Sequence, residues 1–223
     1  MVEIIERNNN FFLQGLNHGL LLEINCCEQI TDYNILNGYL EIDSELYQRF
    51  SNLHENTLAV HLNYLMQKYK IHRHQRFDVN QLAASLMINL NCIRALPEAG
   101  INSMEIIYNA FNYLKDNYLI PGIDLPQVTL SKILHFISPN TFGIVDSIVL
   151  SRLKIWGYRA SYDGLCRFLK DLFQDNNFDN FQNYVLNPGH IQIVERNICM
   201  PNYFLKVIDK VLWTNSRDNL LGL

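Results

Sequence analysis

The sequence predicts an all-α fold, a single compact domain of several helices that spans residues 1–223. Three observations support this prediction. Apolar residues recur with the 3.6-residue period of an α-helix in separate segments, no segment of comparable length alternates as a strand does, and turn-forming Pro and Gly residues lie between the periodic segments. We therefore expect no sheet larger than a short hairpin.

The composition is that of a folded domain and excludes several other classes of protein. Of the 223 residues, 48% are apolar and 12% are aromatic, which is enough to bury a core without disulfides or a structural metal. The formal net charge of −4 gives no global attraction to a polyanion, so any contact with nucleic acid must come from a local basic patch. Because no apolar run approaches the roughly 18 residues of a membrane span, we expect no contact with a membrane.

The five cysteines and the N-terminus indicate a reducing compartment. Cys26 and Cys27 are adjacent, and an odd total fits neither a disulfide framework nor a zinc clamp. The first residues, MVEIIERNNNFF, are acidic where a secretory signal would be basic. We expect a cytoplasmic protein with free thiols, no metal and no other cofactor.

The first half of the chain contains two well-defined predicted helices. Residues 1–50 are the least periodic part of the sequence, and the elements there have no predicted boundaries. The first helix covers about residues 58–69 and follows a cap at Ser51 or Asn52. The second covers about residues 79–93 and has the strongest apolar stripe, so we expect it to be central in the fold.

Two further helices have recognisable starts. The third predicted helix covers about residues 104–114 and follows Asn102, which forms a capping-box pattern with Glu105. The fourth covers about residues 162–172 and follows Ser161, a favourable residue for a helix N-cap.

The fifth predicted helix covers about residues 204–212 and follows Pro201, which suits the first turn of a helix. Turn-forming stretches separate the periodic segments, and we interpret them as turns inside one domain rather than as linkers between domains. These stretches are Pro97–Gly100, Pro121–Pro126, Pro139–Gly143, Trp156–Gly157 and Pro188–Gly189.

Residues 119–155 contain the most specific pattern in the chain. They read as a turn at Pro121–Gly122, a helix over about Val128–Ile137, an irregular loop, and a second helix that opens at Asp146. This order, with IPGI at the turn and PNTFGIVD before the second helix, resembles the helix-hairpin-helix DNA glycosylases. The resemblance is greatest to the bacterial 8-oxoguanine-glycosylase-like group, in which a loop of this kind delivers the catalytic aspartate.

The resemblance implies a DNA-repair hydrolase that cleaves the bond between a base and its sugar. Asp146 is then the catalytic carboxylate, because breaking this bond builds positive charge on the sugar and a carboxylate stabilises that charge. Gly122 is the expected phosphate contact, since a glycine lets backbone N–H groups approach closely. The alternative interpretation is that Asp146 only caps its helix.

The same resemblance predicts a monofunctional enzyme. Bifunctional members of the superfamily carry a Schiff-base lysine at a hairpin position that corresponds here to Gln127 or Val128. Neither side chain can form an imine. Lys132 lies 14 residues before Asp146 and is the second catalytic candidate; the alternative is an ordinary solvated lysine on the helix.

Other residues are candidates for binding. His135, Phe142 and Trp156 are candidates for contacts with a flipped-out base, which aromatic side chains recognise by stacking. For His135 and Trp156 the alternative is a structural role in the core. Arg73 and Arg76 belong to the most basic short stretch of the chain and are candidates for phosphate contacts, whereas the alternative is a solvated surface turn.

Two other functions stay open beside a DNA glycosylase. The first is a catalytically inert helical module that uses the same scaffold to bind protein or nucleic acid, which the net acidity of the chain favours. The second is a hydrolase of a free nucleoside, which needs no basic face for DNA. The sequence identifies neither the base nor a protein partner.

Overall fold

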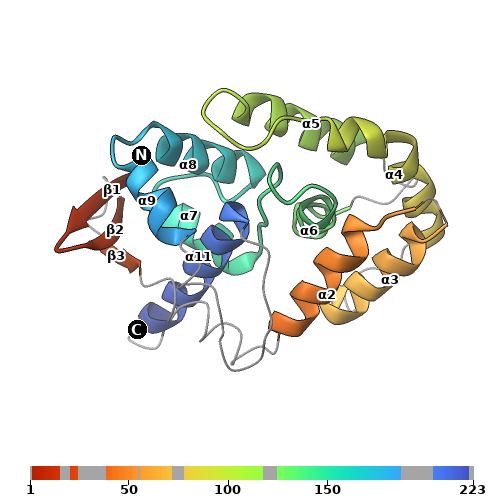
Figure 1. The fold of residues 1–223 in the computed structure, drawn as a ribbon, viewed down its shortest axis with the longest axis horizontal. Coiled ribbons are helices and arrows are strands. Elements are labelled where there is room, and N and C mark those ends of the chain that lie inside the picture. The colour runs from red at the N-terminus through yellow and green to blue at the C-terminus, as the bar shows by residue number, and fades with distance from the viewer. Residues whose placement is uncertain are drawn as a thin grey trace.

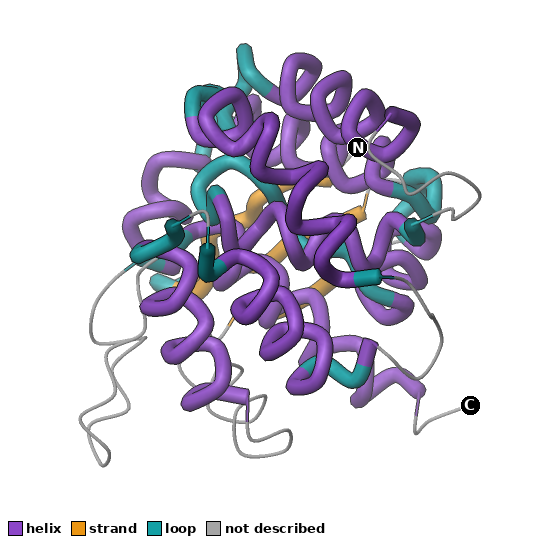
Figure 2. The backbone as a smooth tube through the Cα atoms, turned by 90° about the vertical axis from the view of Figure 1, so that its right-hand side faces the viewer, coloured by secondary structure: helices purple, strands orange, loops and turns teal. Residues whose placement is uncertain are grey.

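The computed structural model describes residues 2–15, 21–24, 39–54, 56–71, 78–117, 125–186 and 203–220. The described chain is mostly helical (Figures 1 and 2), which confirms the predicted all-α class. The helices are α2 Tyr39–Ser51, α3 Leu58–Lys68, α4 Val79–Arg94, α5 Met104–Asn117, α6 Gln127–Ile137, α7 Ser147–Ile155, α8 Tyr162–Gln174, α9 Phe178–Val185 and α11 Phe204–Leu220. None of these helices is long and apolar enough to cross a membrane.

The prediction of no sheet beyond a short hairpin is wrong. Strands β1 (Val2–Arg7), β2 (Asn10–Gly15) and β3 (Leu21–Ile24) form an antiparallel sheet in the order β1-β2-β3. Asn8 and Asn9, between β1 and β2, both have positive φ, the conformation of the two-residue turn that matches the twist of a hairpin.

One face of the sheet is buried, which explains why these short strands form. Alternate residues of all three strands lie in the core: Val2, Ile4, Phe11, Leu13, Leu22 and Ile24. The Phe11 ring lies 5.9 Å from the Phe181 ring and 5.0 Å from the Tyr184 ring, both on α9. The period-2 pattern of these strands is too short to rival the helical stripes of the rest of the chain.

The helices predicted after residue 50 are present, but two predicted caps are wrong. Helix α5 starts directly after Ser103, whose carbonyl accepts a hydrogen bond from the Ile107 backbone N–H at 2.9 Å, and not after Asn102. Helix α3 starts after Thr57 rather than after Ser51 or Asn52, because Ser51 ends the preceding helix α2. The Ser161 side chain accepts a hydrogen bond from the Gly164 backbone N–H at 3.3 Å and caps α8 as predicted. Pro201, predicted before the last helix, lies outside the described residues.

The N-terminal sheet packs on helices from the other end of the chain. The backbone N–H of Ile4 donates to the Asp175 carboxylate at 2.9 Å, and the Asn177 side-chain amide donates to the Ile4 carbonyl at 2.9 Å. Figure 1 shows the resulting arrangement, in which the sheet lies with α7, α8, α9 and α11, while α2 to α6 form the other part of the molecule. The buried apolar residues of both parts belong to one connected cluster that runs from Val2 to Leu212.

Candidate functional site

Two hydrogen-bonded contacts hold the loop after α6 against α6 itself. The Ser131 hydroxyl accepts from the Val145 backbone N–H at 3.1 Å and lies 3.3 Å from the Val145 carbonyl. One turn further along α6, the His135 ring nitrogen Nδ1 lies 2.7 Å from the Phe142 carbonyl oxygen. Because residue 131 is bonded to residue 145, their neighbours Lys132 and Asp146 are brought to the same end of the loop.

The loop also requires Gly143 at its contact with α8. A Cβ atom at Gly143 would lie 2.9 Å from Leu165 Cδ2 and 3.8 Å from Leu169 Cδ1. A larger residue would therefore push the loop away from α8. The glycine keeps the backbone before Asp146 close to the core.

Asp146 caps α7 with only one of its two carboxylate oxygens. Oδ1 accepts hydrogen bonds from the backbone N–H groups of Ile148 at 2.9 Å and Val149 at 2.8 Å. The structure describes no hydrogen bond to Oδ2, and the residue is only partly buried. The predicted helix start at Asp146 is confirmed, and the capping leaves one carboxylate oxygen for another role.

Lys132 is a partly buried residue of α6. Its Nζ atom lies 4.8 Å from the centre of the Tyr69 ring. Burial lowers the pKa of the Lys132 amine, while attraction to Asp146 and Asp209 partly offsets that decrease. A desolvated amine of lowered pKa is more often uncharged at neutral pH, and only the uncharged form is a nucleophile.

A network of buried charges lies behind this lysine, between α2 and α11. Lys206 Nζ lies 3.1 Å from Asp209 Oδ2 and 3.5 Å from Asp43 Oδ2. Lys210 Nζ lies 3.2 Å from the same Asp43 oxygen, and the Tyr69 hydroxyl donates to Asp43 Oδ1 at 2.5 Å. We call Asp43, Tyr69, Lys206, Asp209 and Lys210 the α2–α11 network.

In the α2–α11 network two lysines lie beside two aspartates. The pKa values of these groups reflect burial, which disfavours their charged forms, and mutual attraction, which favours them. Burial raises the pKa of Asp43, but Lys206, Lys210 and Tyr69 together bring it below its usual value of 3.8. Burial lowers the pKa of Lys210 to about 8, whereas burial raises the pKa of Asp209. Ionisable groups buried together in this way are costly, and they are more common at functional sites than elsewhere.

His135 and Phe142, two predicted base contacts, are fully buried in the core. The Phe142 carbonyl can only accept a hydrogen bond, so His135 Nδ1 is the donor and its Nε2, 2.5 Å from the Tyr47 hydroxyl, is the acceptor. Both ring nitrogens of a neutral histidine are thus occupied. Burial lowers the pKa of His135 to about 3, which agrees with a neutral structural histidine.

Trp156, the third predicted base contact, is also fully buried. Its ring stacks on Phe168 with a centroid distance of 5.4 Å and an interplanar angle of 16°. In this structure the ring has no free face on which a base can stack.

The remaining predicted residues fall into two sets. Gly122, Arg73 and Arg76 lie outside the described residues. Gln127, one of the two residues at which the resemblance would place a Schiff-base lysine, accepts a hydrogen bond from the Tyr162 backbone N–H at 2.9 Å. Its amide therefore helps to join α6 to α8.

The cysteines that the structure describes carry no disulfide. Cys92 is exposed and Cys166 is buried, and both are free thiols. Burial raises the pKa of Cys166 to about 12, so this thiol stays protonated and unreactive at neutral pH. Within the described ranges, no group of three His, Cys, Asp or Glu side chains could hold a metal ion.

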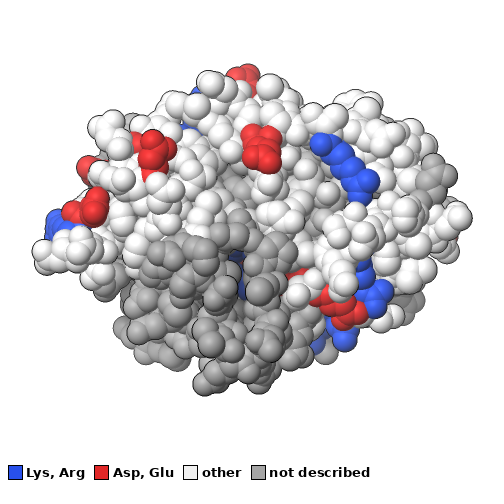
Figure 3. Space-filling view, viewed as in Figure 1, with Lys and Arg blue, Asp and Glu red and all other residues white. Residues whose placement is uncertain are grey.

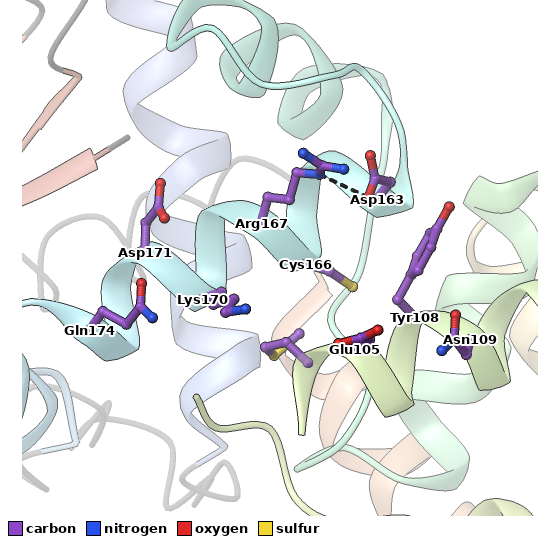
Figure 4. Close-up of a pocket in the computed structure, with 10 residues that line it drawn as sticks. Glu105, Tyr108, Asn109, Asp163, Cys166, Arg167, Lys170, Asp171 and Gln174 are labelled. Carbon is purple, nitrogen blue, oxygen red and sulfur yellow. Dashed lines mark hydrogen bonds and ion pairs between the residues drawn. The ribbon is translucent and has the colours of Figure 1, made fainter. Parts of the chain in front are cut away.

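A surface cleft of about 560 Å³ lies between α5 and α8, away from Lys132 and Asp146. Figure 4 shows its lining, in which Arg167 pairs with Asp163 along α8. The polar groups of this cleft have mixed charge, and its one buried nucleophile is the protonated Cys166. We assign no chemistry to this cleft.

The sequence did not identify the α2–α11 network. Lys206, Asp209 and Lys210 follow one another at the i, i+3 and i+4 spacing of a single helix face, a pattern that usually marks a solvated stripe. Asp43 lies in the segment without clear periodicity. The sequence did contain one indication of buried charge, because these charged residues stand among the apolar residues Val207, Ile208 and Val211.

Comparisons with protein-family models, with curated proteins and with solved structures give no significant match to this chain. Its function must therefore be argued from the chemistry of the site.

Proposed function

We propose that this protein cleaves the bond between a base and its sugar in DNA, with Asp146 and Lys132 as the catalytic pair. The observation that supports this function most strongly is their joint placement. The Ser131–Val145 contact joins the two segments that carry these residues, and the Lys132 amine is attracted to Asp146. The Asp146 carboxylate keeps one oxygen without a described hydrogen bond, and burial lowers the pKa of the Lys132 amine.

The Asp146 carboxylate supplies the electrostatic part of the reaction. As the bond between the base and C1′ breaks, its electron pair leaves with the base and positive charge develops on the sugar. A carboxylate that is already oriented by two backbone N–H groups stabilises this charge without reorganisation. Capping and catalysis are therefore compatible in one residue.

The Lys132 amine supplies a nucleophile at a position other than the hairpin. Its nitrogen lone pair bonds to C1′ as the base leaves with the electron pair of the broken bond, and the amine then gives one proton to the Asp146 carboxylate. When the C1′–O4′ bond of the sugar ring breaks, O4′ takes up that proton and a protonated imine between C1′ and Lys132 remains. This proposal differs from the monofunctional mechanism predicted from Gln127 and Val128. The lowered pKa of Lys132 favours it.

The charge of the surface bears on the substrate. On the face in Figure 3, the basic side chains of the described residues form separate groups and no continuous stripe. On this face, binding of DNA would rely on local contacts, and a free nucleoside is the second candidate substrate because it needs no such stripe.

A base-release assay tests the proposed function. Oligonucleotides with 8-oxoguanine and a panel of other modified bases are incubated with the protein and treated with hot alkali, while free nucleosides are followed by chromatography. Asp146→Asn should lower the rate by at least about 100-fold. It should change the free energy of unfolding by less than about 0.5 kcal/mol, because asparagine is an equally good cap.

The matched control is Asp179→Asn, which removes an exposed carboxylate near the start of α9 and should keep full activity. Activity on nucleosides alone would assign the smaller substrate. A wild-type protein inactive on the whole panel would contradict the proposal and favour the inert helical module. Full activity in Asp146→Asn would contradict the role of this carboxylate.

A further inference from the structure

Helix α7 carries two buried side chains whose hydrogen-bond donors find no acceptor in the described part of the chain. Arg152 and Trp156 lie one turn apart and are 1% and 0% exposed. Among the residues that the structure describes, Nε, Nη1 and Nη2 of Arg152 and Nε1 of Trp156 make no hydrogen bond. Buried donors without a partner are rare in folded proteins, so two adjacent residues that both carry them require an explanation.

The two side chains lie close together. The Arg152 guanidinium carbon lies 5.9 Å from the centre of the Trp156 ring. The Trp156 ring is fixed on one side by Phe168. A Cβ atom at Gly15, the last residue of β2, would lie 2.5 Å from Trp156 Cδ1 and 3.3 Å from its Nε1. The indole N–H edge therefore lies at the end of β2, where glycine provides no side chain.

The charge of Arg152 is not compensated within the described part of the chain. Burial alone lowers the pKa of its guanidinium, with no contribution from a carboxylate, and no described ion pair includes this residue. An arginine does not escape this cost by losing its proton, because its pKa is too high. A water molecule can satisfy an N–H group but cannot neutralise the charge, whereas an anion does both.

We propose that Arg152 and Trp156 form an internal binding site for a small oxyanion. The guanidinium supplies the charge and a planar set of donors that match two oxygen atoms, and the indole N–H supplies one further donor. The ligand class is an anion with at least two oxygen acceptors, such as phosphate, sulfate or a carboxylate. This inference does not rest on the proposed glycosylase activity.

Tryptophan fluorescence measures the site directly. Trp213 is the only other tryptophan in the chain, so a Trp213→Phe background isolates the signal of Trp156. Phosphate, sulfate and acetate are titrated separately at constant ionic strength against chloride. We expect a saturable change in fluorescence and a rise in melting temperature. If only phosphate and sulfate give a response, the ligand of the site is a tetrahedral oxyanion. If acetate gives a response as well, the site also accepts carboxylates.

Variants on α7 assign the response to this site. Arg152→Met should abolish it. Lys154→Gln removes a positive charge from an exposed position on the same helix and should keep it. Trp156→Phe, followed by melting temperature, retains an aromatic ring but loses the N–H and should weaken anion binding by about tenfold.

Two results would overturn the proposal. The first is a wild-type protein whose fluorescence and melting temperature respond to no oxyanion beyond the chloride control. The second is an equal response in Arg152→Met. If Arg152→Met does not fold, an unchanged anion affinity in Trp156→Phe excludes the site instead.

Discussion

Buried charge is arranged differently in two regions of this molecule. In the α2–α11 network, Asp43 lies within 3.5 Å of both Lys206 and Lys210, and Lys206 also pairs with Asp209. On α7, Arg152 is as deeply buried but has no partner among the described residues. In the first region each buried charge has a partner of opposite charge within the fold. This network lies next to Lys132 and forms one wall of the candidate site. The second arrangement is incomplete among the described residues, and we propose that an external oxyanion completes it.

The largest effect should come from breaking the paired region. Asp43→Ala leaves Lys206 and Lys210 without their shared carboxylate and should lower the free energy of unfolding by about 3–5 kcal/mol. Denaturant unfolding measures this loss. Asp116→Asn, which removes an exposed carboxylate near the end of α5, should change the stability little. A loss of less than about 1 kcal/mol for Asp43→Ala would mean that the network is not balanced as described.

His135 shows a third arrangement, in which a buried group stays neutral. Its pKa is lowered from 6.5 to about 3 in the folded protein, so acidification protonates the unfolded chain first. The stabilisation is complete above pH 6.5 and decreases towards pH 3, by up to about 1.4 kcal/mol per pH unit.

Unfolding of the wild-type protein and of His135→Gln at pH 7 and pH 4.5 tests this arrangement. The variant should lose about 2–3 kcal/mol less than the wild type on acidification, although it is less stable at pH 7. His54→Gln makes the same chemical change at an exposed position and should retain the wild-type dependence. Equal pH dependence in His135→Gln would show that His135 is not the group responsible.

The smallest expected change in stability is a gain, whereas Asp43→Ala should cause a loss. In chloride buffer, Arg152→Met replaces an unpaired buried charge with an apolar side chain and should raise the free energy of unfolding by about 1 kcal/mol. Lys206→Met, which removes a paired charge, should lower it. Denaturant unfolding of the two variants side by side measures the contrast. A loss of stability in both variants would contradict the difference between the regions.

Much of the fold around the candidate site could be predicted from local patterns. Helices α6, α7 and α8 have apolar stripes of helical period, and Asp146 and Ser161 are favourable caps, so their positions depend on neighbouring residues only. The sheet was missed because its strands are short and its turn residues, Asn8 and Asn9, form no standard hairpin dipeptide.

The environment of the candidate site could not be predicted in the same way. The pairing of Asp43 with Lys206 joins helices from opposite ends of the chain, and no local pattern encodes that contact. The desolvation of Lys132 and the unpaired donors of Arg152 likewise depend on tertiary packing. The sequence was enough to name Lys132 and Asp146 as candidate residues. The burial that lowers the pKa of Lys132 could be found only from the fold.

Borohydride trapping on an oligonucleotide with an abasic site tests the central claim that Lys132 is a desolvated nucleophile beside Asp146. The exposed C1′ aldehyde reacts with an uncharged amine whatever base the enzyme prefers, and reduction makes the imine permanent. Peptide mass spectrometry should place the adduct on Lys132, and Lys132→Arg, which keeps the charge but cannot attack, should give none. An adduct on another lysine, or base release by wild-type protein without any adduct, would contradict the account.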